Sequence, residues 1–307
     1  FFTIKLFAVP AHYSNIAMTG ASKPALEIGQ QISQQGGNVV DVAVAIGLAM
    51  SVTNPFNASL GGGGFALIKV DKAPVRALDF REAAPIKTHP KYYLEDTKRS
   101  STQGPHAIGV PGFVAGLQAM HKLYGQLKWK DLVEPAIKLA DDGFAVSGQW
   151  VEKTQRTKDK FNKYGHKYFF KSKKTSYKPA EVMKQPQLAR ALKLIQKDAS
   201  SFYNGAIAKD IVGTVNNLGG LLSEEDFKNY KVRWLKPLTA QVQGYKLYSM
   251  PPPSSGGVVM VSAFKLIEEL KLNQLPARSF DEYHMLGEVL KASYRGRAEL
   301  AAPAFAK

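Results

Sequence analysis

The sequence contains no cysteine. This absence excludes a disulfide framework, a zinc–thiolate centre and a thiol nucleophile. It leaves the redox compartment open, because a reducing cytosol needs no disulfides and an exported protein of 307 residues can be stable without them. Any chemistry of this chain therefore depends on other residue types.

The motifs of several self-contained enzymes are also missing. The sequence has no phosphate-binding loop that ends in Gly-Lys-Ser or Gly-Lys-Thr, no HExxH zinc helix and no GxSxG nucleophile elbow. Its six histidines show no i, i+4 pair or other ligand spacing, so we expect surface or capping roles for them. We expect neither a metal site nor a cofactor.

Long apolar runs are scarce. The run from Val39 to Val52 contains Asp41 and is shorter than the roughly 20 residues that a membrane span requires, so no transmembrane segment is predicted. The opening FFTIKLFAVPA has apolar residues, one lysine and a small-residue end, a pattern typical of the tail of a signal peptide and equally of an ordered strand. We expect residues 1–20 to form an N-terminal extension.

Positive charge, by contrast, is abundant. The chain has 41 Lys and Arg against 25 Asp and Glu, a formal charge of +16 that favours acidic partners. Residues 152–184 combine eleven Lys or Arg with three acids and six Phe or Tyr. Such a mixture can bind single-stranded nucleic acid, or it can form a solvated helical face with inward aromatics. We predict the second, a basic helical surface excursion with no nucleic-acid partner, because no nucleic-acid module signature accompanies it.

Helical and strand patterns alternate along the chain, and a hydrophobic content of 45% is enough for a sizeable core. The segments FALIKV and VRALDF, separated by the turn-like DKAP, predict two paired strands. A hairpin around Gly244 is predicted between Val232 and Met250. Helices are predicted around residues 26–35, 39–52, 111–124, 131–142, 188–195 and 207–218, and after Ser223, the run PPPSSGG and Ser279.

The starts of these helices carry capping signals. Pro111 suits the first position of its helix, and Gly125 suits the end. Asp131 with Glu134 and Ser279 with Glu282 resemble capping boxes. The two serines in PPPSSGG are also expected to cap.

Arg81, in the motif DFRE, is a candidate anion-binding residue. A planar guanidinium at the end of a strand can hold a carboxylate through two parallel hydrogen bonds, which lysine cannot reproduce. The alternative is an ion pair of Arg81 with Asp79 or Glu82. The glycine run 61–64 can form an anion-binding nest or a tight turn, and the turn is favoured because a strand pattern follows it.

Five segments in order, GGNVVDVAVAIGLAMSVTNP, LGGGGFALI, ALDFREAAP, GVPGFVAGLQAMHKLYG and SMPPPSSGG, resemble the γ-glutamyltransferase (glutathione hydrolase) family. The resemblance implies an α+β chain with the N-terminal nucleophile hydrolase fold, an αββα sandwich of two stacked sheets between helical layers. It implies that residues 1–307 are the large-subunit portion of a single such domain. A small subunit, cut from the same precursor, completes the domain as an αβ heterodimer.

The resemblance also implies the roles of particular residues. Arg81 binds the α-carboxylate of the γ-glutamyl group, and Glu82 is a candidate partner that orients Arg81. No catalytic residue is expected in this chain, because the nucleophile is the N-terminal threonine of the small subunit. The reaction is cleavage of glutathione and related γ-glutamyl amides, with transfer to water or to an amino acid or peptide. Export to the bacterial periplasm or secretion is expected, with no membrane partner.

The end of the chain departs from the family pattern. The family commonly shows an Asp-Arg pair and a Gly-Asp-Pro-Asp stretch, where this chain has Gly296 with Arg297 and then Ala302, Pro303 and Ala304. Two alternatives stay open. One is a related acylase or poly-γ-glutamate depolymerase of the same fold, although Arg81 argues against an acylase for non-amino-acid chains. The other is a non-catalytic basic binding protein built around residues 152–184.

Overall fold

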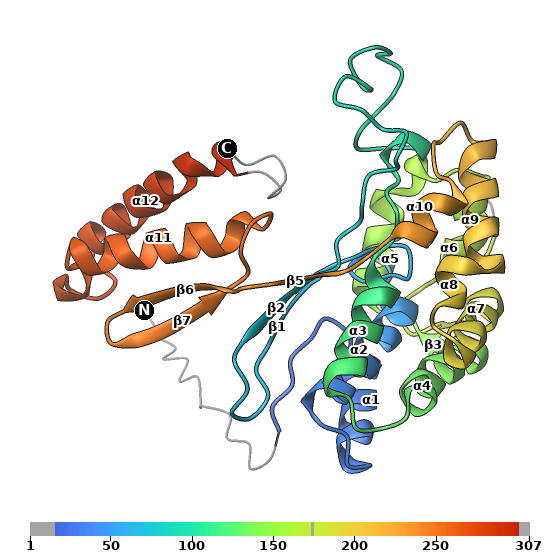
Figure 1. The fold of residues 1–307 in the computed structure, drawn as a ribbon, viewed down its shortest axis with the longest axis horizontal. Helices are drawn as coiled ribbons and strands as arrows, with labels where there is room; N and C mark the ends of the chain where they lie inside the picture. Colours follow the sequence, from blue (N-terminus) through green and yellow to red (C-terminus); the bar gives the residue numbers. More distant parts are fainter. Residues whose placement is uncertain (1–15, 173–174, 301–307) are drawn as a thin grey trace, which may run out of the picture. The chain divides into compact units, whose positions relative to one another are not determined.

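The computed structural model describes residues 16–172 and 175–300, and it mixes α-helices with short antiparallel strands (Figure 1). Most of the predicted extension 1–20, His12 and the segment 302–304 lie outside the described residues. Within the described part, no helix has the combined length and apolar character that a bilayer crossing needs. The chain divides into two compact units. The first contains the described residues up to Asn57 with Gln126–Leu192, and the second contains Ala58–Gly125 and the residues from Lys193 onward.

Helices dominate the first unit. Helix α2 (Val39–Thr53) is apolar on nearly every side, and ten of its 15 residues are buried, so it is the central core helix of this unit. It packs against α1 (Lys23–Gln34) and α4 (Trp129–Asp142). The unit also contains α5 (Gly148–Arg156), η2 (Lys158–Lys160), α6 (Lys163–Phe169), the strand pair β3 (Phe144–Ala145) and β4 (Val182–Met183), and α7 (Pro186–Lys197), which continues into the second unit.

A buried carboxylate fastens the start of α2 to the segment that precedes α4. Asp41 is fully buried and accepts hydrogen bonds from the backbone N–H groups of Asn38 (3.1 Å), Gln126 (3.1 Å) and Leu127 (3.2 Å). An ionised carboxylate presents only acceptors, so it satisfies three backbone donors at once. Asp41 therefore holds together two segments that lie 85 residues apart.

The replacement Asp41→Asn is expected to lower the free energy of unfolding by about 2 kcal/mol. The amide keeps one acceptor oxygen but turns an NH₂ donor toward backbone N–H groups. Chemical denaturation measures the loss. Asp142→Asn, at the exposed end of α4, is the control and is expected to change stability by less than about 0.5 kcal/mol. Equal effects of the two substitutions would contradict this role of Asp41.

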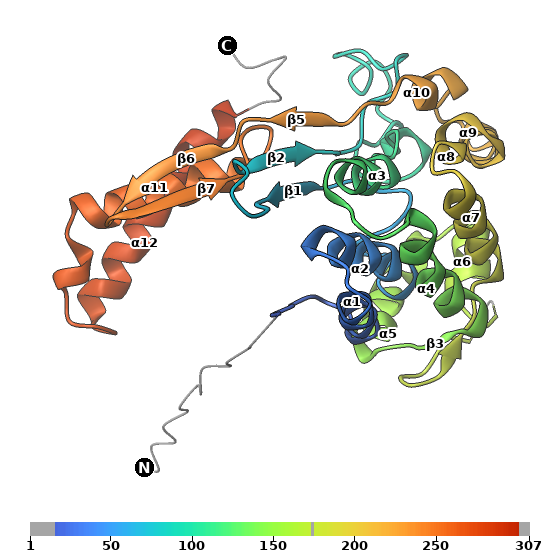
Figure 2. The same ribbon diagram turned by 60° about the horizontal axis from the view of Figure 1, so that its bottom comes forward.

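The second unit contains a three-stranded antiparallel sheet with β2 (Arg76–Asp79) in the centre. Strands β1 (Phe65–Ile68) and β5 (Arg233–Leu235) flank β2, and Figure 2 shows the three side by side. The other elements are η1 (Pro105–Ala107), α3 (Phe113–Tyr124), α8 (Ser201–Asn204), α9 (Ala206–Asn217), α10 (Glu224–Asn229), the hairpin β6 (Leu238–Val242) and β7 (Tyr245–Ser249), α11 (Ser255–Glu269), η3 (Leu272–Gln274), α12 (Phe280–Arg295) and η4 (Gly296–Glu299).

Several local predictions are confirmed. The strands on either side of DKAP pair as β1 and β2, and Gly125 ends α3. The turn at Gly244 joins β6 to β7, but the predicted hairpin is shorter than expected. Residues 233–235 pair with β2 instead, because the edge of that strand offers them a backbone ladder.

The predicted start of α3 at Pro111 is wrong by two residues. The helix begins at Phe113, with Gly112 in the N-cap position. The backbone N–H groups of Gly112 and Phe113 both donate to the carbonyl oxygen of Gly62 at 2.9 Å. This contact satisfies donors that the helix itself leaves unpaired, and it fixes the helix start next to the glycine run.

Three predicted caps also differ. Helix α4 begins two residues before Asp131, so this carboxylate lies in the first turn, where it complements the helix dipole without capping. Ser254 occupies the N-cap of α11 but makes no side-chain capping bond. At α12, Ser279 accepts from the Glu282 N–H at 3.1 Å, but the Glu282 carboxylate accepts from the backbone of Arg278, so the box is half formed.

Candidate functional site

Strand β2 carries the DFRE motif to its end, where the chain leaves the sheet. The ladder with the β1 side continues for one residue after the strand, because the Phe80 N–H donates to the Gly64 carbonyl (3.0 Å) and the Gly64 N–H donates to the Phe80 carbonyl (3.2 Å). Arg81 is the next residue. Its place at the end of a strand is the one that the sequence predicts.

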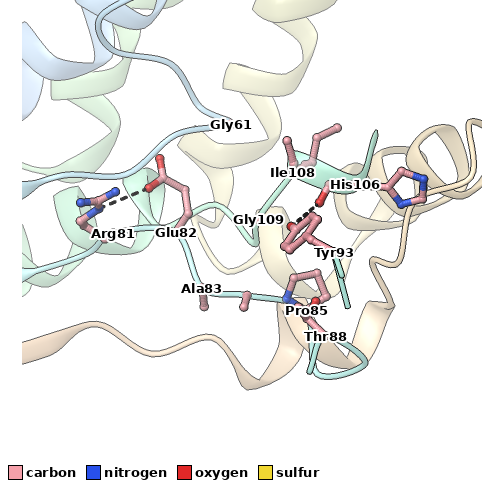
Figure 3. Close-up of a pocket in the computed structure, with 12 residues that line it drawn as sticks. Gly61, Arg81, Glu82, Ala83, Pro85, Thr88, Tyr93, His106, Ile108 and Gly109 are labelled. Carbon is pink, nitrogen blue, oxygen red and sulfur yellow. Dashed lines mark hydrogen bonds and ion pairs between the residues drawn. The ribbon is translucent and has the colours of Figure 1, made fainter. Parts of the chain in front are cut away.

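The Arg81 side chain is half exposed and lightly paired. Its Nε lies 3.8 Å from Glu82 Oε2, which is longer than a hydrogen bond, and its guanidinium carbon lies 5.7 Å from the centre of the Phe65 ring. Figure 3 shows Arg81 and Glu82 turned toward each other. Among residues 16–172 and 175–300, no group forms a hydrogen bond with this guanidinium. Its planar end is therefore open to an anionic ligand.

The alternative partner of Arg81, Asp79, is engaged elsewhere. Asp79 is only 3% exposed, and its Oδ2 pairs with Arg233 of β5. Its Oδ1 accepts from the backbone N–H of Arg81 at 3.0 Å, so the contact between these residues involves the main chain of Arg81 and not its guanidinium. Because Arg233 compensates the charge of Asp79, the Arg81 guanidinium is not needed as the ion-pair partner of Asp79 and can bind another anion.

Arg81 and Glu82 border a cavity of about 510 Å³, a size that accommodates a small molecule. Figure 3 shows these two residues on one side of the space and Tyr93, Pro85 and Thr88 on the other. The full lining consists of Gly61, Arg81, Glu82, Ala83, Ala84, Pro85, Thr88, Tyr93, His106, Ala107, Ile108 and Gly109.

A second, smaller cavity of about 300 Å³ also borders Arg81. Two segments of chain line it, residues 79–83 and residues 230–233. The positive charges of Lys231 and Arg233 therefore lie near that of Arg81. The lining thus combines three cationic side chains with the carboxylates of Asp79 and Glu82. Its lining consists of Asp79, Arg81, Glu82, Ala83, Tyr230, Lys231 and Arg233.

The sequence analysis did not anticipate the loop that closes the larger cavity. An isolated backbone bridge joins Ala83 to Val110, so the 26 residues between them form a loop whose two ends are hydrogen-bonded to each other. In this loop Tyr93 donates from its hydroxyl to the His106 carbonyl at 2.9 Å, and His106 Nδ1 lies 2.7 Å from the Tyr92 hydroxyl. His106 therefore lines the cavity, where the sequence predicted only a surface or capping role.

The glycine run 61–64 forms the predicted turn, in which the Gly62 N–H donates to the Ser59 carbonyl at 3.1 Å. Its small residues also permit close packing of backbones. A Cβ added at Gly63 would lie 2.5 Å from the Phe80 oxygen and 2.8 Å from the Arg81 Cα. The run thus lets the chain pass directly against the DFRE motif. Within the described ranges, no group of three or more His, Asp or Glu residues could hold a metal ion.

Comparison with known proteins identifies relatives over most of the chain. The family model described as gamma-glutamyltranspeptidase matches residues 25–307. Two similar proteins are the glutathione hydrolase proenzymes of Escherichia coli K12, 36% identical over 92% of this chain and 50% of that protein, and of Bacillus subtilis 168, 34% identical over 90% and 48%. The crystal structure of Helicobacter pylori gamma-glutamyltranspeptidase matches with a TM-score of 0.92 and 35% identity over 96% of this chain and 87% of that one.

These similarities confirm the predicted fold class, α+β with the N-terminal nucleophile hydrolase fold. The chain spans about half the length of the curated relatives it matches.

Proposed function

This chain belongs to the γ-glutamyltranspeptidase family, and from that membership and the geometry around Arg81 we propose that it supplies the glutamate-holding part of an active site. The observation that carries the proposal is the open guanidinium of Arg81 on the wall of a cavity, with the nearby Asp79 neutralised by Arg233. In this proposal Arg81 binds the α-carboxylate of the γ-glutamyl group through two parallel hydrogen bonds.

Binding at this end of the substrate serves the chemistry at the other end. The α-carboxylate lies far from the γ-amide bond, and holding it fixes the amide carbon in front of a nucleophile. The γ-glutamyl group then passes to the enzyme and on to water, an amino acid or a peptide. The substrates we propose are glutathione and related γ-glutamyl compounds, consistent with the relatives named glutathione hydrolase proenzyme.

Glu82 has a supporting part in this proposal. Its carboxylate faces Arg81 Nε at 3.8 Å, a side of the guanidinium that leaves the two terminal nitrogens for the substrate. An acid in this position favours one orientation of the guanidinium plane. The two side chains are 55% and 37% exposed, so the ion pair adds little to the stability of the fold. In this proposal its role is to orient the Arg81 guanidinium.

The nucleophile belongs, in our proposal, to a small subunit cut from the same precursor, which begins with threonine and completes the αββα domain as an αβ heterodimer. Two observations support a missing partner. The relatives are named proenzymes, and the segments from β6 to α12 carry large exposed apolar side chains, which commonly mark protein interfaces. These exposed residues include Tyr245, Phe264, Phe280, Tyr283, Leu290 and Tyr294.

We further propose that residues 152–184 are a basic surface excursion and not a nucleic-acid site. The lysines at 153, 160, 163 and 167 are exposed, whereas contacts between rings link Phe161, Tyr168, Phe169 and Phe170. Phe169 lies 5.0 Å from Phe161 and 5.9 Å from the fully buried Trp150 between ring centres. Rings in such contacts are not free to stack on bases. For location, family membership supports an exported protein, in the periplasm or secreted.

A substrate comparison on the complete, processed protein tests the proposal. 4-Aminobutyryl p-nitroanilide has the same amide and the same amine as γ-glutamyl p-nitroanilide but lacks the α-carboxylate. We expect kcat/KM for the γ-glutamyl compound to be higher by roughly 10³-fold or more, because a site built to bind a carboxylate rejects a ligand that lacks it. Similar values for both anilides would contradict the proposal and favour a related acylase.

A further inference from the structure

Both polar backbone groups of Arg81 are held by side chains. Its N–H donates to Asp79 Oδ1 at 3.0 Å, and its carbonyl oxygen accepts from the Tyr230 hydroxyl at 2.7 Å. In the described chain, Arg81 makes no backbone–backbone hydrogen bond, because it lies just past the ladder of β2. These two side chains therefore take the place of the strand neighbours that the residue has lost.

The Asp79 side of this arrangement is rigid. Asp79 lies opposite both Phe65 and Arg233 in the sheet, and its buried carboxylate pairs with the Arg233 side chain. One carboxylate oxygen thus holds the neighbouring strand while the other holds the Arg81 N–H. Any rotation of the Asp79 side chain would break both contacts.

The Tyr230 side is anchored to helix α3. The Tyr230 ring stacks on Tyr203, with ring centres 5.7 Å apart and an angle of 12° between planes. The Tyr203 hydroxyl donates to the Pro111 carbonyl (3.0 Å) and accepts from the Ala115 N–H (3.1 Å) at the start of α3. Burial, together with the charges of nearby carboxylates, raises the pKa of Tyr230 well above its usual value, so this hydroxyl remains a donor at every working pH.

We propose that Asp79 and Tyr230 are positioning residues that set the direction of Arg81 before substrate arrives. This inference rests on the proposed function, in which Arg81 receives the α-carboxylate. Fixing the backbone on both sides of the Cα limits the directions in which the guanidinium can project. Such pre-organisation lowers the cost of binding, so its loss should weaken the hold on the substrate more than it slows the chemical step.

The test compares two Tyr→Phe variants of the complete, processed protein. Tyr230→Phe removes one hydroxyl that holds the Arg81 carbonyl, and it keeps the ring that stacks on Tyr203. Tyr168→Phe is the matched control, because it removes a hydroxyl bonded to Gln185 from a largely buried tyrosine in the first unit. We expect Tyr230→Phe to raise KM for γ-glutamyl p-nitroanilide roughly five- to tenfold with kcat within about twofold, the effect of one lost hydrogen bond. Tyr168→Phe should leave KM unchanged.

Three outcomes overturn the inference. One is an unchanged KM in Tyr230→Phe, and another is an equal change in both variants, which would reflect general destabilisation. The third is an unchanged KM in Asp79→Asn, a second variant that acts on the other side of Arg81. Turnover by Arg81→Met separates the two proposals. If Arg81→Met loses activity while Tyr230→Phe does not change, the positioning role fails and the proposed function stands; if Arg81→Met is as active as the parent, both fail.

Discussion

Replacing Arg81 with methionine is expected to lower kcat/KM for a γ-glutamyl anilide by roughly two to three orders of magnitude, or about 3–4 kcal/mol of transition-state binding. Methionine has a similar length but cannot donate a hydrogen bond or carry charge. Two charge-assisted hydrogen bonds to the α-carboxylate are lost, each worth about 1.5–3 kcal/mol. Steady-state kinetics on the processed protein measures the effect.

The conservative variant and a remote control sharpen this prediction. Arg81→Lys keeps the charge without the planar fork, so its kcat/KM should fall between those of the parent and Arg81→Met. Arg156→Met removes an equally large cation from the exposed surface of α5 and should change nothing. A value for Arg81→Met within about twofold of the parent would refute the role of Arg81.

The second large effect is expected from Gly112→Ala. A Cβ at this position would collide with the Phe80 carbonyl oxygen and with the Tyr230 hydroxyl, so the methyl group has no space on either side. Both obstacles are fixed: Phe80 belongs to the backbone ladder, and Tyr230 is held between Tyr203 and Arg81. We expect a loss of about 3 kcal/mol in unfolding free energy, the upper part of the usual range for overpacking.

The matched control is Gly213→Ala. Gly213 lies exposed within α9, and a Cβ there would meet nothing within 4 Å. Alanine is the better helix former, so this variant should be as stable as the parent or up to about 1 kcal/mol more stable. Thermal and chemical unfolding of both variants give the comparison. Gly112→Ala with the stability of Gly213→Ala would show that the contact around Gly112 is not tight.

The parts of the fold that could be predicted are those set by neighbouring residues. The turn-like DKAP between two β-rich segments was enough to pair β1 with β2, and helical spacing was enough to define α2. The pairing of β2 with β5 on its other edge could not be predicted. Strand β5 lies about 150 residues further along the chain, and no local sequence pattern indicates which strand pairs with β2 there. Arg233 was therefore assigned to a hairpin that it does not join.

The candidate site follows the same division. Arg81 was found because its motif is local and distinctive, and the resemblance gave it a role. Tyr230 contacts the backbone of Arg81, and Arg233 contacts Asp79, which in turn holds Arg81. Each of these contacts joins residues that lie about 150 positions apart in the sequence, so no local pattern predicts them. The sequence analysis considered Asp79 only as a possible ion-pair partner of Arg81, whereas the structure gives the ion pair to Arg233 and the backbone contact to Arg81.

The most direct test of the central claim is a crystal structure of the complete, processed protein with glutamate bound. We predict that both α-carboxylate oxygens lie within hydrogen-bond distance, about 2.7–2.9 Å, of the Arg81 guanidinium nitrogens. Glutamate that occupies the site with its α-carboxylate on other residues, and with Arg81 still facing only Glu82, would contradict it.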